Sequence, residues 1–553
     1  MRKIIYIVLL FSLVLLFVSC FNTNDPVENL PETQVTEAEI TEQPVVAEPP
    51  ALTYSGTQIP VIVVREEQYL PIEPVDESQE GKIVYSVNDI NAGKIVGENV
   101  QDMGGQLSIV KAEANLGYKF VRWSDGQTNP ERGGNDEEGL YTAIFDYDIL
   151  DLPIVVIDTD RQIRSKTRYV TGAISILGCE EQYIIEEAPV EIRGRGNATW
   201  RFEKKSYKFK LEEKENLFDM ANGKERVWVL LANHCDQSLL RNHIGLELGR
   251  VLSGIVWEPA SVPVEVYLNG DYLGAYLLAE EIKISGDRID ITDTTPDEVD
   301  TGYMIEMTKY VDNGDEVITI AKREHVIHNE LSEDNAIKKA QKEFISNYLN
   351  DCYEAFKSGN FEEANRLVDL RSLAAAYIIQ ETAKNHDAQW DNFYMWKDAG
   401  GKLYFGPSWD FDIAMANAWE ESAKIESFLA ANGIGASTML SDWFPVALSN
   451  EWFRQIVQDE WNKDYEKIKG LPAYIIEAGE RHQSSYERNF ERWPIFGQRI
   501  NLEPESIMAL DNYIAHYTYL SEWMEERIEW LNSAFNHENF VSGGEGLKRV
   551  RKG

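Results

Sequence analysis

Three oxygen-bearing side chains in the second half of the chain have a spacing that suits phosphoryl transfer. Asp387 is followed five residues later by Asn392, and a short apolar stretch then leads to Asp410 and Phe411. A carboxylate can accept the proton of an attacking hydroxyl, while a second carboxylate and an amide oxygen are hard ligands for a divalent cation. The spacing therefore predicts metal-assisted phosphoryl transfer, with Asp387 as the base and Asn392 and Asp410 as metal ligands.

This layout is typical of a protein-kinase catalytic core, in which a hairpin separates the two halves of the site. Two residues depart from the usual kinase pattern. His386 stands directly before Asp387, and we expect it to orient the loop through hydrogen bonds rather than to titrate. Asp412 replaces a glycine, and the sequence leaves open whether it is a second metal ligand or a turn residue. Asp391 is expected to be an ordinary solvated acid.

Basic residues gather earlier in the chain, around a turn and the strand that follows it. Arg195 lies between two glycines within residues 193–200, and lysines alternate with aromatic residues beyond it. Glycines let backbone N–H groups approach phosphate oxygens, and alternation separates the ammonium groups from the rings. The pattern fits a nucleotide-phosphate site, the alternative being a tight turn that leads into a solvated basic strand. Arg241 is a further candidate because its planar guanidinium suits phosphate.

The length and charge of the chain limit what it can be. With 553 residues it is too long for one hydrophobic core, which predicts two or three domains. A formal net charge of -40 argues against nucleic acid or an anionic membrane surface as a partner, since both need basic protein surface. The same charge favours the approach of a basic or neutral acceptor over an acidic one.

The N-terminus has the features of an export signal. Two basic residues precede an apolar run from Ile4 to Val18 that is short for a membrane span. Residues 1–20 end in a sequence that resembles a bacterial lipobox and predict a lipoprotein signal peptide with lipid on Cys20; an ordinary signal peptide with a chance cysteine is the alternative. Residues 21–58 contain many acids and no Lys or Arg, which predicts a disordered acidic tether. We therefore expect an extracytoplasmic protein, lipid-anchored to the bacterial membrane or cell surface.

Residues 81–148 predict a small all-β module, because short alternating runs are separated by Gly, Asn and Asp turns. The stretch from Gly117 to Gly126 resembles the core of divergent internalin-B-type repeats of bacterial surface proteins, which implies a spacer or an adhesive element. A plain β spacer with Trp123 in its core is the favoured interpretation. The remaining cysteines are widely spaced and predict buried free thiols, with one pair among them left open: Cys179, Cys235 and Cys352.

Residues 152–536 are long enough for a two-lobed domain. Their first part is rich in strands, and Asn269-Gly270 between two apolar runs predicts a tight type I′ hairpin. The later part predicts helices, with Ser332 as one N-cap and a long periodic run from Glu505 to Phe535. The expected fold class is α+β, a small all-β module followed by a β-rich lobe and a helical lobe, which is the order found in protein kinases.

Several phrases of this segment together resemble the CotH-type kinases, a family named for a spore-coat protein. A fixed order of several phrases is far more specific than any one of them. The resemblance implies an atypical protein-kinase-like domain over residues 152–536 that transfers phosphate from ATP to Ser or Thr of secreted or surface proteins. The phrases are Arg193-Gly194-Arg195-Gly196-Asn197, Lys204-Lys205-Ser206-Tyr207, Trp228-Val229-Leu230-Leu231-Ala232-Asn233, Asp236-Gln237-Ser238-Leu239-Leu240-Arg241-Asn242, Tyr267-Leu268-Asn269-Gly270-Asp271-Tyr272-Leu273-Gly274-Ala275-Tyr276 leading to Glu280, the block from Asn385 to Asn392, and Trp409-Asp410-Phe411-Asp412.

The resemblance also implies roles for individual residues. Asp387 would be the base, and Asn392 and Asp410 would hold Mg²⁺ or Mn²⁺ against the phosphates of ATP. A lysine of the strand after the Gly-rich turn would contact the phosphates and could pair with Glu280. The sequence does not decide which lysine this is, and the candidates are Lys205, Lys208 and Lys210.

Two functional classes remain open. The first is an exported atypical Ser/Thr protein kinase that uses ATP and a divalent metal on a surface protein substrate. The second is a non-catalytic surface binding or adhesion protein that keeps the kinase-like fold. The predicted base and metal ligands favour the first, because a pure binder has no physical need for them. Residues 537–553 are expected to form a flexible tail, and the sequence does not indicate an oligomeric state.

Overall fold

The structure is a computed structural model that describes residues 80–220, 223–292, 298–389, 391–429 and 443–542. The predicted signal peptide with Cys20 and the predicted tether at 21–58 lie outside the described residues. Within the described part, no helix combines the length and the apolar character that crossing a membrane requires.

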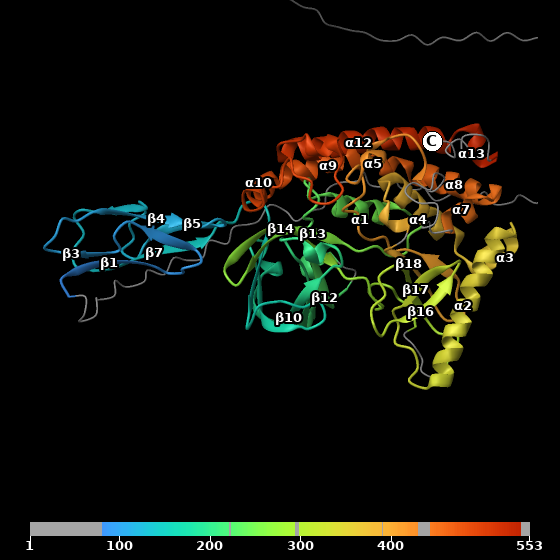
Figure 1. Ribbon diagram of the computed structural model, residues 1–553, viewed down its shortest axis with the longest axis horizontal. Helices are drawn as coiled ribbons and strands as arrows, with labels where there is room; N and C mark the ends of the chain where they lie inside the picture. The colour runs from blue at the N-terminus through green and yellow to red at the C-terminus, as the bar shows by residue number, and fades with distance from the viewer. Residues whose placement is uncertain (1–79, 221–222, 293–297, 390, 430–442, 543–553) are drawn as a thin grey trace, which may run out of the picture. The chain divides into compact units, whose positions relative to one another are not determined.

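The first described part is a small β module made of two sheets (Figure 1). One sheet has the order β3-β1-β7-β5 and the other the order β2-β4-β6. Trp123 is fully buried and donates its indole N–H to the Asn129 carbonyl at 2.9 Å, so the prediction that Trp123 lies in a core is confirmed. The strands are β1 (Lys82–Val87), β2 (Gly93–Val96), β3 (Val100–Asp102), β4 (Ile109–Ala114), β5 (Tyr118–Trp123), β6 (Glu131–Gly133) and β7 (Gly139–Tyr147).

The module shares part of its hydrophobic core with the strands that follow it. Tyr267 and Tyr272 belong to the same buried cluster as Trp123. The Tyr118 hydroxyl donates to the Gly270 carbonyl at 2.8 Å. Apolar and polar contacts therefore both join the module to the next part of the chain.

The strand-rich region after the module closes into a barrel with the order β10-β11-β12-β14-β13-β8-β9. The rings of β11 point inward while Lys208 and Lys210 alternate with them, as the sequence pattern predicts. Asn269 and Gly270 have φ values of 52° and 81°, which confirms the predicted hairpin turn. The strands are β8 (Ile154–Thr159), β9 (Val170–Leu177), β10 (Ile185–Arg195), β11 (Ser206–Glu215), β12 (Glu225–Leu231), β13 (Ser261–Leu268) and β14 (Asp271–Glu280); short 3-10 turns lie at η2 (Glu181–Tyr183), η3 (Thr199–Arg201) and η4 (Leu217–Asp219).

A second sheet, with the order β16-β17-β15-β18-β19, lies among the helices of the later part. Its β18–β19 hairpin is the apolar stretch between Asn392 and Asp410, so the hairpin expected there is present. The chain after the barrel supplies the other strands, and β15 pairs antiparallel with β18. The strands are β15 (Tyr303–Met307), β16 (Glu316–Ile320), β17 (Arg323–Ile327), β18 (Phe393–Lys397) and β19 (Leu403–Phe405).

Helices make up most of the remaining structure, which confirms a mixed α+β fold with a sheet-rich first region and a helical later region. Asp334, rather than Ser332, caps α2, since its carboxylate accepts the backbone N–H groups of the first turn. The periodic run to Phe535 is two helices because Asn512 caps the second one. The helices are α1 (Arg241–Val251), α2 (Asn335–Lys357), α3 (Phe361–Leu367), α4 (Leu370–Ala383), α5 (Glu420–Ala423), α7 (Trp443–Leu448), α8 (Glu451–Ile468), α9 (Leu471–Arg481), α10 (Gln483–Arg492), α11 (Glu505–Met508), α12 (Tyr513–Phe535) and α13 (Glu538–Ser542).

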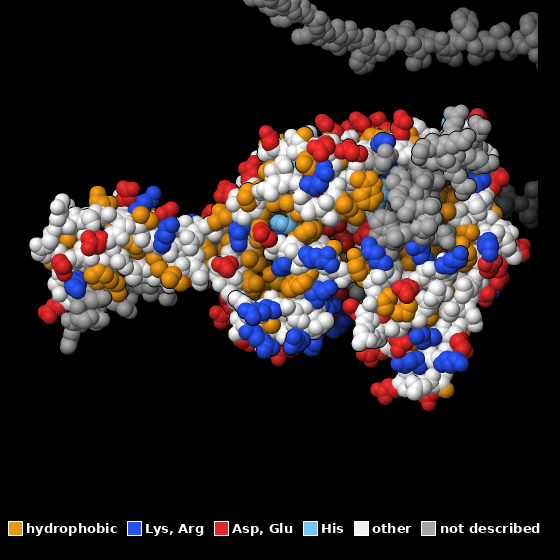
Figure 2. Space-filling model, viewed as in Figure 1, with side chains coloured by type: hydrophobic (Ala, Val, Ile, Leu, Met, Phe, Trp, Pro, Cys, Tyr) orange, Lys and Arg blue, Asp and Glu red, His pale blue; other side chains and the backbone are white. Residues whose placement is uncertain are grey.

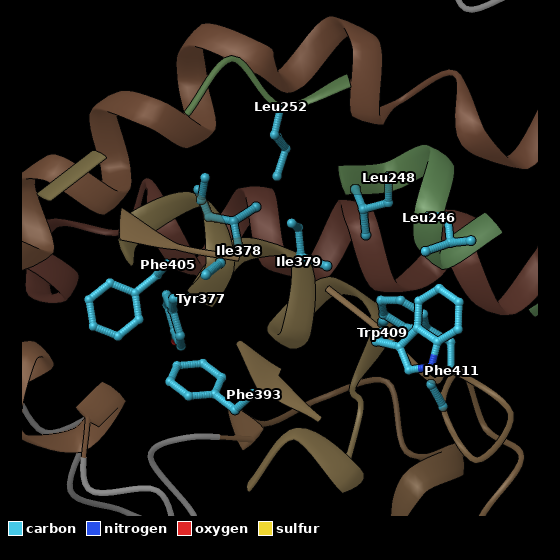
Figure 3. Close-up of a cluster of buried hydrophobic side chains, with 14 of the residues drawn as sticks. Leu246, Leu248, Leu252, Tyr377, Ile378, Ile379, Phe393, Phe405, Trp409 and Phe411 are labelled. Carbon is cyan, nitrogen blue, oxygen red and sulfur yellow. The ribbon is translucent and has the colours of Figure 1, made fainter. Parts of the chain in front are cut away.

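Helix α4 lies at the centre of the largest hydrophobic cluster. Every residue of α4 except Arg371 is buried. Figure 3 shows Tyr377 and Ile379 of α4 among apolar side chains that come from the α1 region and from the β18–β19 hairpin. A helix buried on all sides has little freedom to move. It therefore gives a firm base to the loop that begins directly after Ala383.

The three cysteines of the folded part are free and buried, which agrees with the prediction of unpaired thiols. Helix α13 extends the folded part beyond residue 536 into the predicted tail. Phe540 of this helix is buried in the main hydrophobic cluster. An apolar side chain held in the core explains why this stretch of the predicted tail is helical.

His243 of α1 makes the stability of the fold depend on pH. Its Nδ1 lies 2.8 Å from the Ser261 hydroxyl and its Nε2 lies 2.9 Å from the Tyr474 hydroxyl. Burial lowers the pKa of His243 to about 3, below the value of about 6.5 for a free histidine. The unfolded chain therefore takes up the proton first on acidification. The contribution of His243 to stability is fully present above about pH 6.5 and is lost progressively as the pH falls toward about 3.

We expect the melting temperature of the wild type to fall as the pH is lowered from about 7 to about 4.5. The variant His243→Gln should be less stable at neutral pH but should lose less over the same range, because the titrating group is gone. The exposed His537 provides a control, and His537→Gln should follow the wild type. Parallel pH curves for His243→Gln and the wild type would show that other groups cause the dependence.

Candidate functional site

The loop after α4 carries the predicted catalytic residues. Lys384 ends the helix in the left-handed conformation, with φ 47°. The side chain of the buried Asn385 then accepts the backbone N–H of Asp387 at 3.1 Å and donates to the Asp410 carbonyl at 3.1 Å. Asn385 therefore ties the Asp387 loop to the second acidic segment, 23 residues further along the chain from Asp387.

Asp387 and Asn392 are brought into direct contact. The Asn392 amide donates to Asp387 Oδ2 at 2.9 Å, and the backbone of Asn392 has φ 54°. The other carboxylate oxygen of Asp387 lies 3.9 Å from the Lys309 ammonium group. The side chain of Asp387 is only 16% exposed. One of its oxygens is thus oriented by an amide, while the other faces a cation.

Asp391 is a buried acid, so the prediction of a solvated side chain is wrong. Thr308, at the end of β15, donates its hydroxyl to Asp391 Oδ1 at 2.5 Å. Burial raises the pKa of Asp391 to about 6. Lys309 lies 3.9 Å from Asp391 as well as from Asp387. The sequence analysis missed Lys309, because it is 78 residues from Asp387 in the chain and reaches the site only through the β15–β18 pairing.

His386 does not form the hydrogen bonds predicted for it. Its ring is buried, and neither ring nitrogen has a hydrogen-bond partner among the described residues. The ring packs against Trp419, with 4.9 Å between the ring centroids. Burial lowers the pKa of His386 to about 3, which agrees with the expectation that it does not titrate near neutral pH. His386 therefore supports the loop by packing.

Asp410 and Asp412 form a coupled acidic pair near Asp387. Burial, the Asp412 charge and then the Asp387 charge raise the pKa of Asp410 well above its usual range. Burial raises the pKa of Asp412 to about 6. The Cys235 thiol donates to Asp412 Oδ2 at 3.1 Å, and this hydrogen bond lowers the pKa of Asp412 in part. Like charges this close cannot both ionise freely unless a cation lies between them.

The donor set fits a divalent cation. A bound Mg²⁺ usually takes one or two carboxylates and completes its coordination with substrate phosphates and water. Asp410, Asp412 and the amide oxygen of Asn392 are hard donors of this kind. In the part of the chain that the structure describes, no group of three or more His, Cys, Asp or Glu side chains is arranged to hold a metal by itself. The site therefore has ligands for a cation that would also bind phosphate.

Arg241 holds the acidic segment in place and does not face the site. It is fully buried and pairs with Asp236, with 2.5 Å between Nη1 and Oδ1. Its Nε donates to the Met415 carbonyl at 3.1 Å. The neighbouring Asn242 accepts the backbone N–H of Phe411 at 2.7 Å. Asp236 and a backbone carbonyl hold two nitrogens of the guanidinium, while Nη2 has no hydrogen-bond partner among the described residues. Arg241 is not among the residues that line the pocket described below, and its predicted phosphate contact stays a prediction.

Across from the acids, Lys208 and Arg195 share one carboxylate, that of Glu281. Lys208 Nζ lies 2.7 Å and Arg195 Nε lies 3.7 Å from its oxygens. Burial alone would raise the pKa of Glu281, but Lys208 and then Arg195 hold it below its usual value. The Arg195 guanidinium lies 4.8 Å from the centre of the Trp409 ring. Trp409 directly precedes Asp410 in the chain. This links the Gly-rich turn to the acidic segment.

The predicted pairing of a strand lysine with Glu280 is wrong. Glu280 is the last residue of β14 and pairs with Arg288 at 3.3 Å. Strand alternation sends Glu280 and Glu281 to opposite sides, and only Glu281 faces Lys208. The other two candidate lysines are engaged elsewhere, since Lys205 donates to the carbonyls of the Gly-rich turn and Lys210 lies 3.5 Å from Glu191.

A small pocket separates the basic and acidic groups. Lys204 lines this pocket and was not a candidate in the sequence analysis. Its ammonium group is buried, which lowers its pKa well below the usual value, and it donates to Asn489 at 2.8 Å. The alternating pattern of β11 does not indicate that Lys204 is buried in the pocket, because Lys204 precedes the strand. The lining residues include Arg195, Lys204, His234, Asn242, Trp409, Asp410 and Asp412.

Fold and site together define a mixed α+β protein with the donor groups that phosphoryl transfer requires. The chain belongs to the family described as CotH kinase protein, whose model matches residues 192–531. The family resemblance seen in the sequence is thereby confirmed, and the match runs from β10 into α12. The comparison with curated proteins gave no match. The lipoprotein signal and the internalin-like character of the β module lie outside the matched residues and stay predictions.

The buried pair of Asp236 and Arg241 should carry a large share of the stability near the site. Replacing one partner leaves the other charge buried and unpaired, so Asp236→Ala should lower the free energy of unfolding by about 3–5 kcal/mol. Asp351→Ala, at an exposed position of α2, is the matched control and should change it by less than about 0.5 kcal/mol. Chemical denaturation measures both values. The double variant Asp236→Leu with Arg241→Met should lose less than Asp236→Ala, because it leaves no charge in the interior; an equal or larger loss would contradict this account.

Proposed function

We propose that this protein is an atypical protein kinase that transfers the γ-phosphoryl group of ATP to Ser or Thr hydroxyl groups of proteins outside the cytoplasm. Family membership supports a kinase-like activity. The observation that carries the finer proposal is the contact between Asp387 and Asn392 beside the coupled pair Asp410 and Asp412. A base, an amide and two further carboxyl groups are the set that an ATP-dependent phosphotransferase needs.

Each side of the site has its own part in this proposal. Asp387 accepts the proton of the acceptor hydroxyl, with Asn392 holding one of its oxygens in orientation. Lys208 and Arg195 bind the nucleotide phosphates, and Glu281 holds the two cations together at the edge of the pocket that Arg195 lines. The barrel followed by the helical region supports a two-lobed, kinase-like architecture with the pocket between the lobes.

Asn392, Asp410 and Asp412 would hold Mg²⁺ or Mn²⁺, and the cation would neutralise charge on the phosphates of ATP. A cation there would also relieve the repulsion that raises the pKa of Asp410. We further propose that the protein is exported and anchored by lipid on Cys20, which rests on the apolar run and the lipobox-like sequence at the N-terminus.

Removal of the base or of a metal ligand should abolish phosphoryl transfer. The full chain is incubated with labelled ATP, Mg²⁺ or Mn²⁺ and a Ser-containing protein substrate. Asp387→Asn and Asp410→Asn should each lower the transfer rate at least about 100-fold, because the first removes the proton acceptor and the second a charged ligand.

The exposed acid Asp351 on α2 supplies the control, and Asp351→Asn should keep the wild-type rate. If the wild type transfers no label and neither ATP nor metal changes its melting temperature, the kinase proposal fails. A non-catalytic surface binding protein with a kinase-like fold is then the better description.

The two neighbouring glutamates at the end of β14 allow a test of the cation assignment. Glu281→Gln should raise the KM for ATP roughly tenfold, a change of about 1.4 kcal/mol in binding, because Lys208 and Arg195 lose their shared anchor. Glu280→Gln should lower thermal stability through Arg288 and leave the KM for ATP near the wild-type value. Steady-state kinetics at varied ATP concentration distinguish the two variants. An effect on KM from Glu280→Gln alone would overturn the assignment of Lys208.

A further inference from the structure

Lys and Arg side chains gather beside the candidate site. The loop between β8 and β9, residues 160–169, contains four cations and one acid, and residues 193–205 contain five cations and one acid. None of the seven side chains that we call the basic patch forms an ion pair with another described residue. The basic patch consists of Arg161, Arg164, Lys166, Arg168, Arg193, Arg201 and Lys205.

The two segments of the basic patch are bonded to each other. The backbone N–H of Gly194 donates to the Ser165 carbonyl at 2.9 Å. The Lys166 ammonium group donates to the Asn197 side chain at 3.1 Å, and the Arg193 guanidinium donates to the Lys166 carbonyl. The cations of the β8–β9 loop are thereby held next to the Gly-rich turn, although their charges repel.

Arg164 and Lys205 of the basic patch have neutral hydrogen-bond partners, whereas Arg193 also feels the charge of Glu281. Arg164 bonds the side-chain carbonyl of Gln162, at 2.6 Å and 3.0 Å, and Lys205 bonds backbone carbonyls. Lys338 and Lys342 of α2, in contrast, both pair with Glu316. In Figure 2, Lys and Arg side chains are gathered over the part of the barrel where Figure 1 labels β10 and β12. This surface is positively charged, whereas the chain as a whole has a net charge of -40.

The basic patch adjoins the candidate active site through one residue. Arg195 belongs to the same turn as Arg193, and its guanidinium lies over Trp409 beside Asp410. Arg195 and Lys208 suffice to face the phosphates of a nucleotide, so the seven further cations are in excess of that need. Their place at the edge of the pocket suits a larger anion that approaches the same site.

We propose that the basic patch docks an acidic segment of the acceptor protein, so that a hydroxyl near that segment reaches Asp387. This inference rests on the proposed kinase function and names its substrate class. The overall charge of the chain favours a basic or neutral acceptor at long range, but salt screens such attraction beyond about 10 Å at 0.1 M. Contacts within the basic patch are shorter, so its local charge decides which acceptor is held.

The test compares charge-reversed variants of the full chain. Binding of a fluorescent peptide with one Ser among Glu and Asp residues is measured by anisotropy without nucleotide, and phosphorylation of the same peptide is measured separately. Arg164→Glu with Arg168→Glu should weaken binding and lower kcat/KM for this peptide at least about tenfold at low salt, with the KM for ATP unchanged. Arg164→Lys with Arg168→Lys should restore most of the binding, because the charge is kept.

The control reverses the same amount of charge on the β module, through Lys111→Glu with Lys119→Glu, and should bind as the wild type does. Equal binding of the acidic peptide and of a matched Lys-rich peptide would overturn the inference. The inference would also be overturned if the protein bound vesicles of phosphatidylcholine and phosphatidylglycerol, lost this binding in the charge-reversed variant and did not bind the peptide. Patch-dependent peptide binding without phosphorylation of any peptide would support the docking surface and refute the kinase proposal, so the two failures are distinguishable.

Discussion

The buried ion pair between Asp236 and Arg241 is the interaction on which the candidate site depends. Asp236 accepts hydrogen bonds from the backbone and side chain of Ser238 and from Arg241, at the point where α1 begins. Arg241 in turn reaches the carbonyl of Met415, just after the acidic segment. A charge in the protein interior is tolerated only when it is paired. The pair therefore holds α1 against the segment that carries Asp410 and Asp412.

Charge is divided across the pocket in a way that gives the site its chemistry. The acids come from the α4 loop and the segment after β19, whereas the cations come from the barrel strands and the Gly-rich turn. Glu281 is an acid on the basic side, and its carboxylate holds the side chains of Lys208 and Arg195 in place. Repulsion among the acids and attraction across the pocket both favour a cation with phosphate between the two sides. The proposed nucleotide and metal satisfy this demand together.

Features that depend on neighbours in the chain could be predicted well. The hairpin after Asn392, the alternation of β11 and the Asn269 turn follow from local backbone preferences, and all three are present. Features that depend on distant partners could not. Asp391 is buried and accepts the hydroxyl of Thr308, and Arg241 is held in the interior by Asp236 and the Met415 carbonyl. Contacts of this kind produce no periodic pattern in the sequence.

The sequence by itself determined the family, the order of strands and helices, and the acids and amide that come together at the site. Spacing along the chain carries this information because residues a few positions apart on one loop or strand have few ways to be arranged. Only the tertiary structure decided that Glu281 rather than Glu280 meets Lys208. It also decided that the seven cations of the basic patch, which form no ion pair with another described residue, gather beside the pocket. These outcomes depend on which segments meet when the barrel closes, since electrostatic pairing and burial act through space rather than along the chain.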